Sequence, residues 1–234
     1  MEIKRAAIKH NAKLLIAQTK PSPILVILVY LLIDTLLLEL SYRISGMDKL
    51  INDMTEEIQK GNLQYIPQTP ALSGWAYVLL AALAVMGMLL LAGLTVYCLE
   101  ICQRRKGGVG NLFDGFTLFA KVIGLFIVQG IFIYLWSLLL IIPGIIAAYR
   151  YRQALYLLLE NPDYGILECL SRSSRMMTGH KGELFMLDLS FLGWYLFSYI
   201  PGAVVWVEPY TRITYTNYYL ALRDMPQSAF DATV

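Results

Sequence analysis

The sequence predicts an all-α membrane protein, a polytopic bundle of about six transmembrane helices with amphipathic helices at the membrane interface. Hydrophobic residues make up 57% of the 234 residues and charged residues only 15%, whereas a soluble domain carries about 25% charged residues. Several apolar runs approach or exceed the roughly 18 residues that indicate a bilayer span. The polar stretches between them are short, so residues 1–234 are expected to form a single integral membrane domain.

The first 22 residues are basic and are expected to form a short amphipathic helix that ends before Pro21. An apolar run over about 24–40 follows, and no small-residue cleavage site comes after it. This run is therefore expected to be a retained first span rather than a removed signal peptide.

Two helices of different kinds are expected next. Over about 46–60, apolar residues recur at helical spacing among charged ones, a pattern typical of an amphipathic helix at a surface. The second span covers about 75–99, with Trp75 as an interfacial anchor. Alanines and glycines along this span, Gly93 among them, permit close helix contact in lipid.

The stretch LLLIIPGIIAAYRYRQALYLLLENP, residues 138–162, decides the topology. The third span, about 122–142, runs into it and meets Pro143 and Gly144. Because proline stops a helix and glycine permits a turn, we expect a helical hairpin here. The returning fourth span, about 144–160, would be about 25 Å long, near the lower limit for crossing a bilayer.

The last third of the chain is expected to hold one more amphipathic helix and two further spans. The amphipathic helix covers about 163–178, after an Asn-Pro start signal. The fifth span covers about 184–200, and the sixth, about 203–222, is unusually polar.

The distribution of basic residues predicts the orientation, since Lys and Arg in short connectors mark the cytoplasmic side. Residues 1–22 carry five, residues 100–121 four and residues 160–183 three. Six spans place all three segments and both termini in the cytoplasm, as expected for a multi-pass protein of the cytoplasmic membrane. A five-span protein in which residues 144–160 lie at the interface is the alternative.

Ionisable residues inside the predicted spans form the first candidate site. A charge within the bilayer costs several kcal/mol unless it is paired or hydrated. Six spans place opposite charges from three helices at similar depths, about 8–9 Å below the outer surface. The expected intramembrane cluster consists of Asp34, Arg150, Glu208 and Arg212. Its expected periphery consists of Glu39, Arg152 and Tyr210, and a smaller polar contact nearer the inner side is expected from Gln129 and Asp188.

The second candidate site is a positive surface that faces lipid or a partner on the cytoplasmic side. It consists of Arg172, Arg175 and Lys181 on and after the second amphipathic helix. Membrane lipids are the expected partners, with another membrane protein or a second copy of this chain as further candidates. Each basic residue near an anionic membrane surface contributes on the order of 1 kcal/mol.

Other classes of function find little support. A net charge of +2 is too small to indicate nucleic-acid binding. The only histidines, His10 and His180, lack metal-ligand spacing, and three cysteines do not form an even disulfide framework. We therefore expect no metal, no cofactor, no catalytic residues and no enzymatic activity.

Three segments carry a resemblance to a known family: LLIIPGIIAAYRY, ENPDYGILECLSRSSRMMTGHKGELFMLDLSFLGW and VEPYTRITYTNYYLALR. They resemble the uncharacterised bacterial integral membrane proteins of domain-of-unknown-function family 975, most clearly over residues 110–223. The resemblance implies a multi-span protein of the cytoplasmic membrane without an assigned biochemical role.

The function predicted from these observations is that of a non-catalytic scaffold or accessory subunit. The alternative is a transporter or lipid-handling protein that uses the intramembrane charged cluster. The cluster is either an ion-pair network that fixes helix register or the lining of a polar cavity, and the sequence leaves both open.

Overall fold

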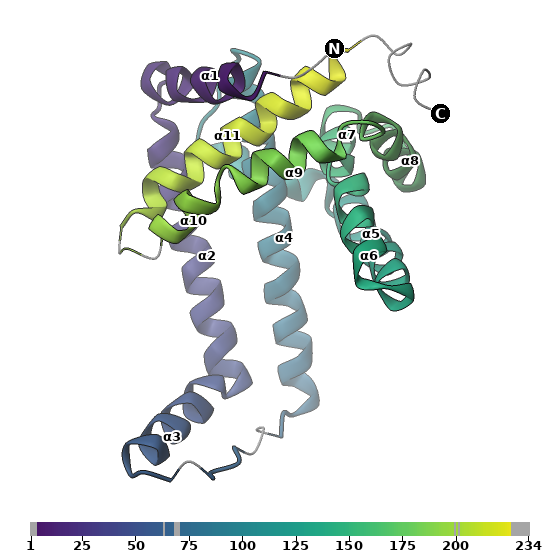
Figure 1. Ribbon diagram of the computed structural model, residues 1–234. Coiled ribbons are helices and arrows are strands. Elements are labelled where there is room, and N and C mark those ends of the chain that lie inside the picture. The colour runs from purple at the N-terminus through teal and green to yellow at the C-terminus, as the bar shows by residue number, and fades with distance from the viewer. Residues whose placement is uncertain (1–3, 63, 68–70, 199, 201, 226–234) are drawn as a thin grey trace. The chain divides into compact units, whose positions relative to one another are not determined.

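The computed structural model describes residues 4–62, 64–67, 71–198, 200 and 202–225, and all regular elements in this part of the chain are helices (Figure 1). The prediction of an all-α fold is thereby confirmed. The chain divides into two compact units. One comprises Met1–Val29 with Leu89–Val234 and is called the main unit; the other is Tyr30–Met88.

The Tyr30–Met88 unit is built from the greater part of α2 (Pro23–Ser45), from α3 (Met47–Gln59) and from the first half of α4 (Gly74–Cys102). Gly46 joins α2 to α3 with φ 68°, a left-handed conformation that glycine adopts at little cost. None of the residues of α3 is buried, as expected for an amphipathic helix at a surface.

Three of the described helical segments are long and apolar enough to cross a membrane. They are Pro23–Ser45, Gly74–Cys102 and Val109–Leu139. Most of their apolar surface is exposed, which suits a helix that lipid surrounds because hydrocarbon chains are as apolar as leucine. These three candidate membrane helices suggest a multi-pass membrane protein, and they correspond to the first three of the six predicted spans.

The basic N-terminal segment forms α1 (Arg5–Gln18), which packs along α11 (Val204–Arg223) in the main unit (Figure 1). Its apolar face buries Ile8 and Ala12. Lys9 extends its ammonium group to the hydroxyl of Ser190 at 2.7 Å. The predicted amphipathic helix is therefore present, and its apolar face is covered by protein.

Two glycines bring helix backbones into direct contact in the main unit. The 3₁₀ helix η1 (Val109–Leu118) crosses the second half of α4, and a Cβ on Gly93 would lie 2.0 Å from the carbonyl oxygen of Leu112. A Cβ on Gly115 would lie 2.1 Å from the carbonyl oxygen of Leu89. The small residues predicted to permit close packing do so at Gly93.

The predicted hairpin around residue 140 is present, but its turn lies elsewhere than expected. Helix α5 (Phe119–Leu139) and helix α6 (Ile141–Tyr151) are joined by the extended residue Leu140. Pro143 sits in the first turn of α6, where a helix needs no amide donor. Gly144 does not form the turn. Its lack of a side chain lets α6 pack closely against α5, because a Cβ there would lie 2.1 Å from the hydroxyl of Ser137.

The prediction of one continuous helix over 144–160 is wrong. Helix α6 ends at Tyr151, and α7 (Ala154–Glu160) begins after a turn at Arg152 and Gln153. Ser173 from α8 (Ile166–Met176) is fully buried against this interruption. Its hydroxyl donates to the carbonyl of Arg150 at 2.8 Å and accepts from the amide of Gln153 at 3.2 Å. The interruption thus exchanges helical hydrogen bonds for contacts to a side chain.

The predicted helix over 184–200 is also interrupted. It consists of α9 (Lys181–Leu189) and α10 (Leu192–Phe197), separated by a turn at Ser190 and Phe191. Phe191 is fully buried, which fixes the turn in the core of the main unit. Helix α8 corresponds to the predicted amphipathic helix, and α11 corresponds to the predicted last span.

The glycine contacts generate a stability prediction. We expect Gly93→Ala and Gly115→Ala each to lower the free energy of unfolding by about 1–3 kcal/mol, because the new methyl group meets backbone that has no room to move. Gly87→Ala is the control, since a Cβ there meets nothing within 4 Å. Unfolding in detergent checks this, and equal effects at Gly87 and Gly93 would contradict it.

Candidate functional site

The carboxylate of Asp188, near the end of α9, joins three helices of the main unit. Arg152 donates to one carboxylate oxygen at 2.6 Å and Tyr149 to the same oxygen at 2.7 Å. Tyr215 of α11 donates to the other oxygen at 2.7 Å. The Arg152 guanidinium also lies over the Tyr215 ring, 4.6 Å from its centroid. Asp188 therefore connects the turn between α6 and α7 to α9 and α11.

A second ion pair lies on α11. Arg212 donates to Glu208 at 2.7 Å, one helical turn away. Both side chains line a cavity of about 430 Å³ together with Gln129 and Arg152, and we call it the Arg152 cavity. The structure therefore brings three of the predicted residues, Arg152, Glu208 and Arg212, to one polar cavity.

Arg150 lies outside this lining. Its guanidinium is 6.0 Å from the ring centroid of Trp136 on α5, and among the described residues its Nε has no hydrogen-bond partner. The predicted pairing of Arg150 with Glu208 does not occur, because Glu208 pairs with Arg212 on its own helix. Residues 150 and 152 point to different sides of the helix, and it is Arg152 that faces the carboxylate of Asp188.

The remaining predicted members lie in other surroundings. Glu39 pairs with Arg43 at 2.9 Å, and both side chains are largely exposed. Tyr210 packs edge-on against Phe191 and Trp194, away from the ion pairs. Asp34 belongs to the Tyr30–Met88 unit, so its meeting with Arg150 stays a prediction.

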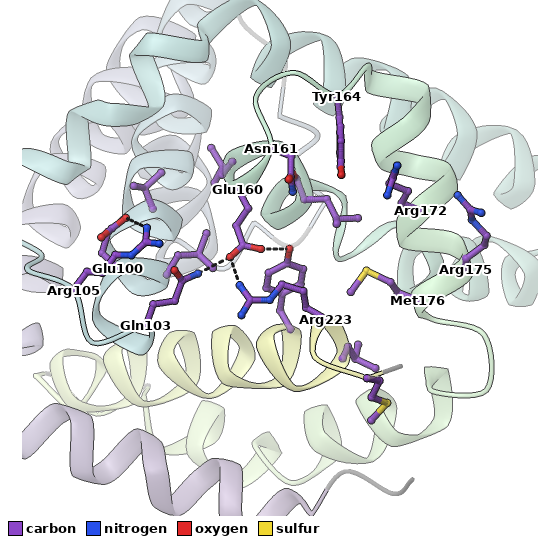
Figure 2. A pocket seen from close by; sticks show the side chains of 17 residues that line it. Glu100, Gln103, Arg105, Glu160, Asn161, Tyr164, Arg172, Arg175, Met176 and Arg223 are labelled. Atoms are coloured by element: carbon purple, nitrogen blue, oxygen red, sulfur yellow. Dashed lines mark hydrogen bonds and ion pairs between the residues drawn. The ribbon is translucent and has the colours of Figure 1, made fainter. Parts of the chain in front are cut away.

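A second and larger pocket, of about 750 Å³, is rich in basic side chains (Figure 2). Four arginines and two glutamates line it. The arginines, which define what we call the basic pocket, are Arg105, Arg172, Arg175 and Arg223. In Figure 2 the two α8 arginines lie on one side of Glu160 and Arg105 lies on the other. The basic residues thus come from the loop after α4, from α8 and from the end of α11.

Glu160 occupies the middle of the basic pocket. Its carboxylate accepts from Gln103, from Tyr219 at 2.6 Å and from Arg223 at 2.5 Å (Figure 2). Arg105 pairs more loosely with Glu100, at 3.4 Å. Within the described residues, Arg175 makes no ion pair and is exposed. Part of the arginine charge is therefore matched by protein and part is open to a ligand.

Arg172 and Arg175, two of the three residues of the predicted positive surface, both line the basic pocket. Arg172 pairs with Glu168 at 2.8 Å and covers the ring of Tyr164 at 4.3 Å. Lys181 begins α9 and is not among the residues that line the basic pocket. Apolar residues complete the lining, among them Val96, Leu99, Leu157, Leu159, Leu222 and Met225.

The described residues contain no group of three or more His, Cys, Asp or Glu side chains arranged to hold a metal ion. Cys169 on α8 is fully buried, and burial raises the pKa of its thiol above the usual range. The neighbouring Glu168 carboxylate acts in the same direction. A thiol of raised pKa is a poor nucleophile at neutral pH because little thiolate forms.

Sequence reasoning missed several residues that the structure places at these sites. Glu160 and Arg223 are not among the predicted site residues, and Arg105 was counted only as one of the basic residues of the connector 100–121. Their common signal is position, since Glu160 and Arg223 are the last residues of α7 and α11 and Arg105 lies in the loop that follows α4. Asp188 was expected to contact Gln129; its carboxylate instead accepts from Tyr149, Arg152 and Tyr215, while Gln129 lines the Arg152 cavity.

The described residues form a helical fold with three candidate membrane helices, and its main unit holds the Arg152 cavity and the basic pocket. Residues 137–225 match the family described as "Protein of unknown function (DUF975)". This segment, from the end of α5 through α11, is therefore a domain of that uncharacterised family, and the resemblance noted in the sequence is confirmed. Comparisons with curated proteins and with solved structures gave no match.

Proposed function

We propose that this chain is a non-catalytic scaffold of the cytoplasmic membrane that binds anionic phospholipid headgroups in the basic pocket. The observation that carries the proposal is the convergence of four arginines on one pocket, where Arg175 makes no ion pair among the described residues while Glu168 and Asp224 pair with Arg172 and Arg223 from outside the lining. Guanidinium groups form bidentate hydrogen bonds with phosphate oxygens. Basic pockets between helices on the cytoplasmic side are typical sites for anionic lipid headgroups.

The apolar part of the lining supports a lipid over a water-soluble phosphate. Leucine, valine and methionine side chains stand beside the arginines in the same pocket. An amphiphile satisfies both kinds of wall, because its phosphate meets the arginines while its first acyl carbons cover the apolar residues. A fully hydrated phosphate ester would leave the apolar wall exposed to water.

The topology that accompanies this proposal has six crossings, with both termini and the basic pocket on the cytoplasmic side. The interrupted helices α6–α7 and α9–α10, together with α11, would supply the three crossings beyond the apolar segments. Interrupted helices are tolerated at membrane depth where the protein satisfies their backbone groups, as Ser173 does between α6 and α7. The basic connectors then all lie inside.

Cysteine accessibility distinguishes six crossings from five. Asn52 and Ser171 are exposed on α3 and α8, respectively. With an impermeant thiol reagent on intact cells, we expect Asn52→Cys to react and Ser171→Cys to react only after permeabilisation. The unchanged chain, in which Cys98 and Cys169 are buried and Cys102 is partly exposed, is the background control. Reaction of Ser171→Cys on intact cells would favour five crossings.

Lipid binding is tested by native mass spectrometry of the full chain in detergent. We expect phosphatidylglycerol to be retained at least about tenfold more than phosphatidylcholine. Arg172→Gln with Arg175→Gln should weaken this binding by about fivefold per arginine, since each contributes on the order of 1 kcal/mol. Arg43→Gln is the matched control, because Arg43 does not line the pocket.

Two results would contradict the proposal. The first is equal retention of the two lipids by the unchanged protein. The second is an unchanged affinity for phosphatidylglycerol in the double variant. Competition by sn-glycerol 3-phosphate at equal affinity would assign the pocket to free phosphate esters instead of lipid.

A further inference from the structure

The Arg152 cavity is lined by one helix interruption, and the residue that pairs with Arg152 lies just before a second one. Arg152 and Gln153 form the turn between α6 and α7, and both line the cavity. Asp188, which holds Arg152, comes from the end of α9 just before the second turn. Interrupted helices around a polar site are a recurring way to bind solutes within helical membrane proteins.

The cavity wall carries charges of both signs. Arg152 and Arg212 provide two guanidinium groups, and Glu208 provides a carboxylate. Asp188, which does not itself line the cavity, forms an ion pair with Arg152. The Arg152 side chain is 36% exposed and the Asp188 side chain 23%, so both groups keep some access to solvent. Glu208 would repel a solute that carries only a negative charge. The two guanidinium groups would repel a solute that carries only a positive charge.

The rest of the lining combines hydrogen-bonding and apolar groups. Thr211, Tyr195 and Tyr215 supply hydroxyls, while Leu91 and Phe126 supply apolar surface. A volume of about 430 Å³ is within the range of small-molecule sites, which extends from about 300 to 1,000 Å³. Such a lining accepts an organic solute that has both charged ends and an apolar portion.

One buried group of the lining lacks a partner. Gln153 is 2% exposed, and its Oε1 has no hydrogen-bond partner among the described residues. Its Nε2 is directed to the sulfur of Met177 at 3.7 Å. Buried acceptors of this kind are uncommon in folded proteins, where each one left unpaired costs about 1–3 kcal/mol. A donor such as an ammonium or amide N–H matches this oxygen.

We propose that the Arg152 cavity binds a small zwitterionic solute, a free amino acid or short peptide whose carboxylate meets the guanidinium groups and whose ammonium meets Glu208. This site is separate from the basic pocket, and the two share none of their lining residues. A carboxylate and an ammonium presented together replace both halves of the Arg212–Glu208 pair. No other charge pattern does so without leaving one of these groups unpaired.

The test compares free and blocked forms of the same solutes on the purified full chain in detergent. The free probes are leucine and the dipeptide Leu-Leu. The blocked probes are their N-acetyl derivatives, which lack the ammonium, and their C-terminal amides, which lack the carboxylate. Ligand-induced shifts of the thermal unfolding midpoint are read for each probe. At ten times the dissociation constant, we expect at least one free form to raise the midpoint by about 3 °C.

Both blocked forms of that probe should produce less than a third of this shift. Glu208→Gln should abolish the advantage of the free form over the N-acetyl form, while Glu39→Gln, whose carboxylate is exposed on α2, should preserve it. Should Glu208→Gln fail to fold, the comparison of free and blocked forms on the unchanged protein decides the matter. No shift from either free probe, or equal shifts from free and blocked forms, would overturn the proposal.

Discussion

The carboxylate of Asp188 is the contact on which the main unit depends. It binds Arg152 at the interruption between α6 and α7, and it accepts from tyrosines on α6 and α11. Each of these hydrogen bonds involves a charged acceptor, and such bonds are stronger than neutral ones. The buried hydroxyl of Ser173 completes the arrangement by satisfying the backbone at the same interruption. Without these contacts, the turn at Arg152 would leave polar groups without partners in an apolar environment.

Both cavities follow from this arrangement. An uninterrupted helix over 144–160 would direct its side chains in a regular spiral, whereas the turn at residues 152 and 153 directs Arg152 and Gln153 to a cavity wall. Helix α7 then ends at Glu160, whose carboxylate orders Gln103, Tyr219 and Arg223 around the basic pocket. The charges that an apolar bundle tolerates least are thus gathered at two sites.

Apolar periodicity was sufficient to predict α1 to α5 and α8 within a few residues, because each is a continuous helix with one clear pattern. It did not predict the turns at Arg152 and at Ser190, since neither contains glycine or proline and both are stabilised by residues distant in the sequence, Ser173 and Lys9. Of the four residues that the depth argument grouped, Glu208 and Arg212 line the Arg152 cavity, together with Arg152 from the expected periphery. The depth argument also grouped Arg150 with these residues. Depth along a helix does not give the direction of a side chain, and the direction of Arg150 depends on the interruption between α6 and α7.

A double-mutant cycle between Arg152 and Asp188 tests most directly the claim that their ion pair links the interrupted helices. The free energy of unfolding in detergent is measured for Arg152→Gln, for Asp188→Asn and for the double variant. We expect a coupling energy of about 1–2 kcal/mol, so that the double variant loses less stability than the sum of the single variants. Additive effects, within about 0.5 kcal/mol, would contradict the claim that this pair connects α6 and α9.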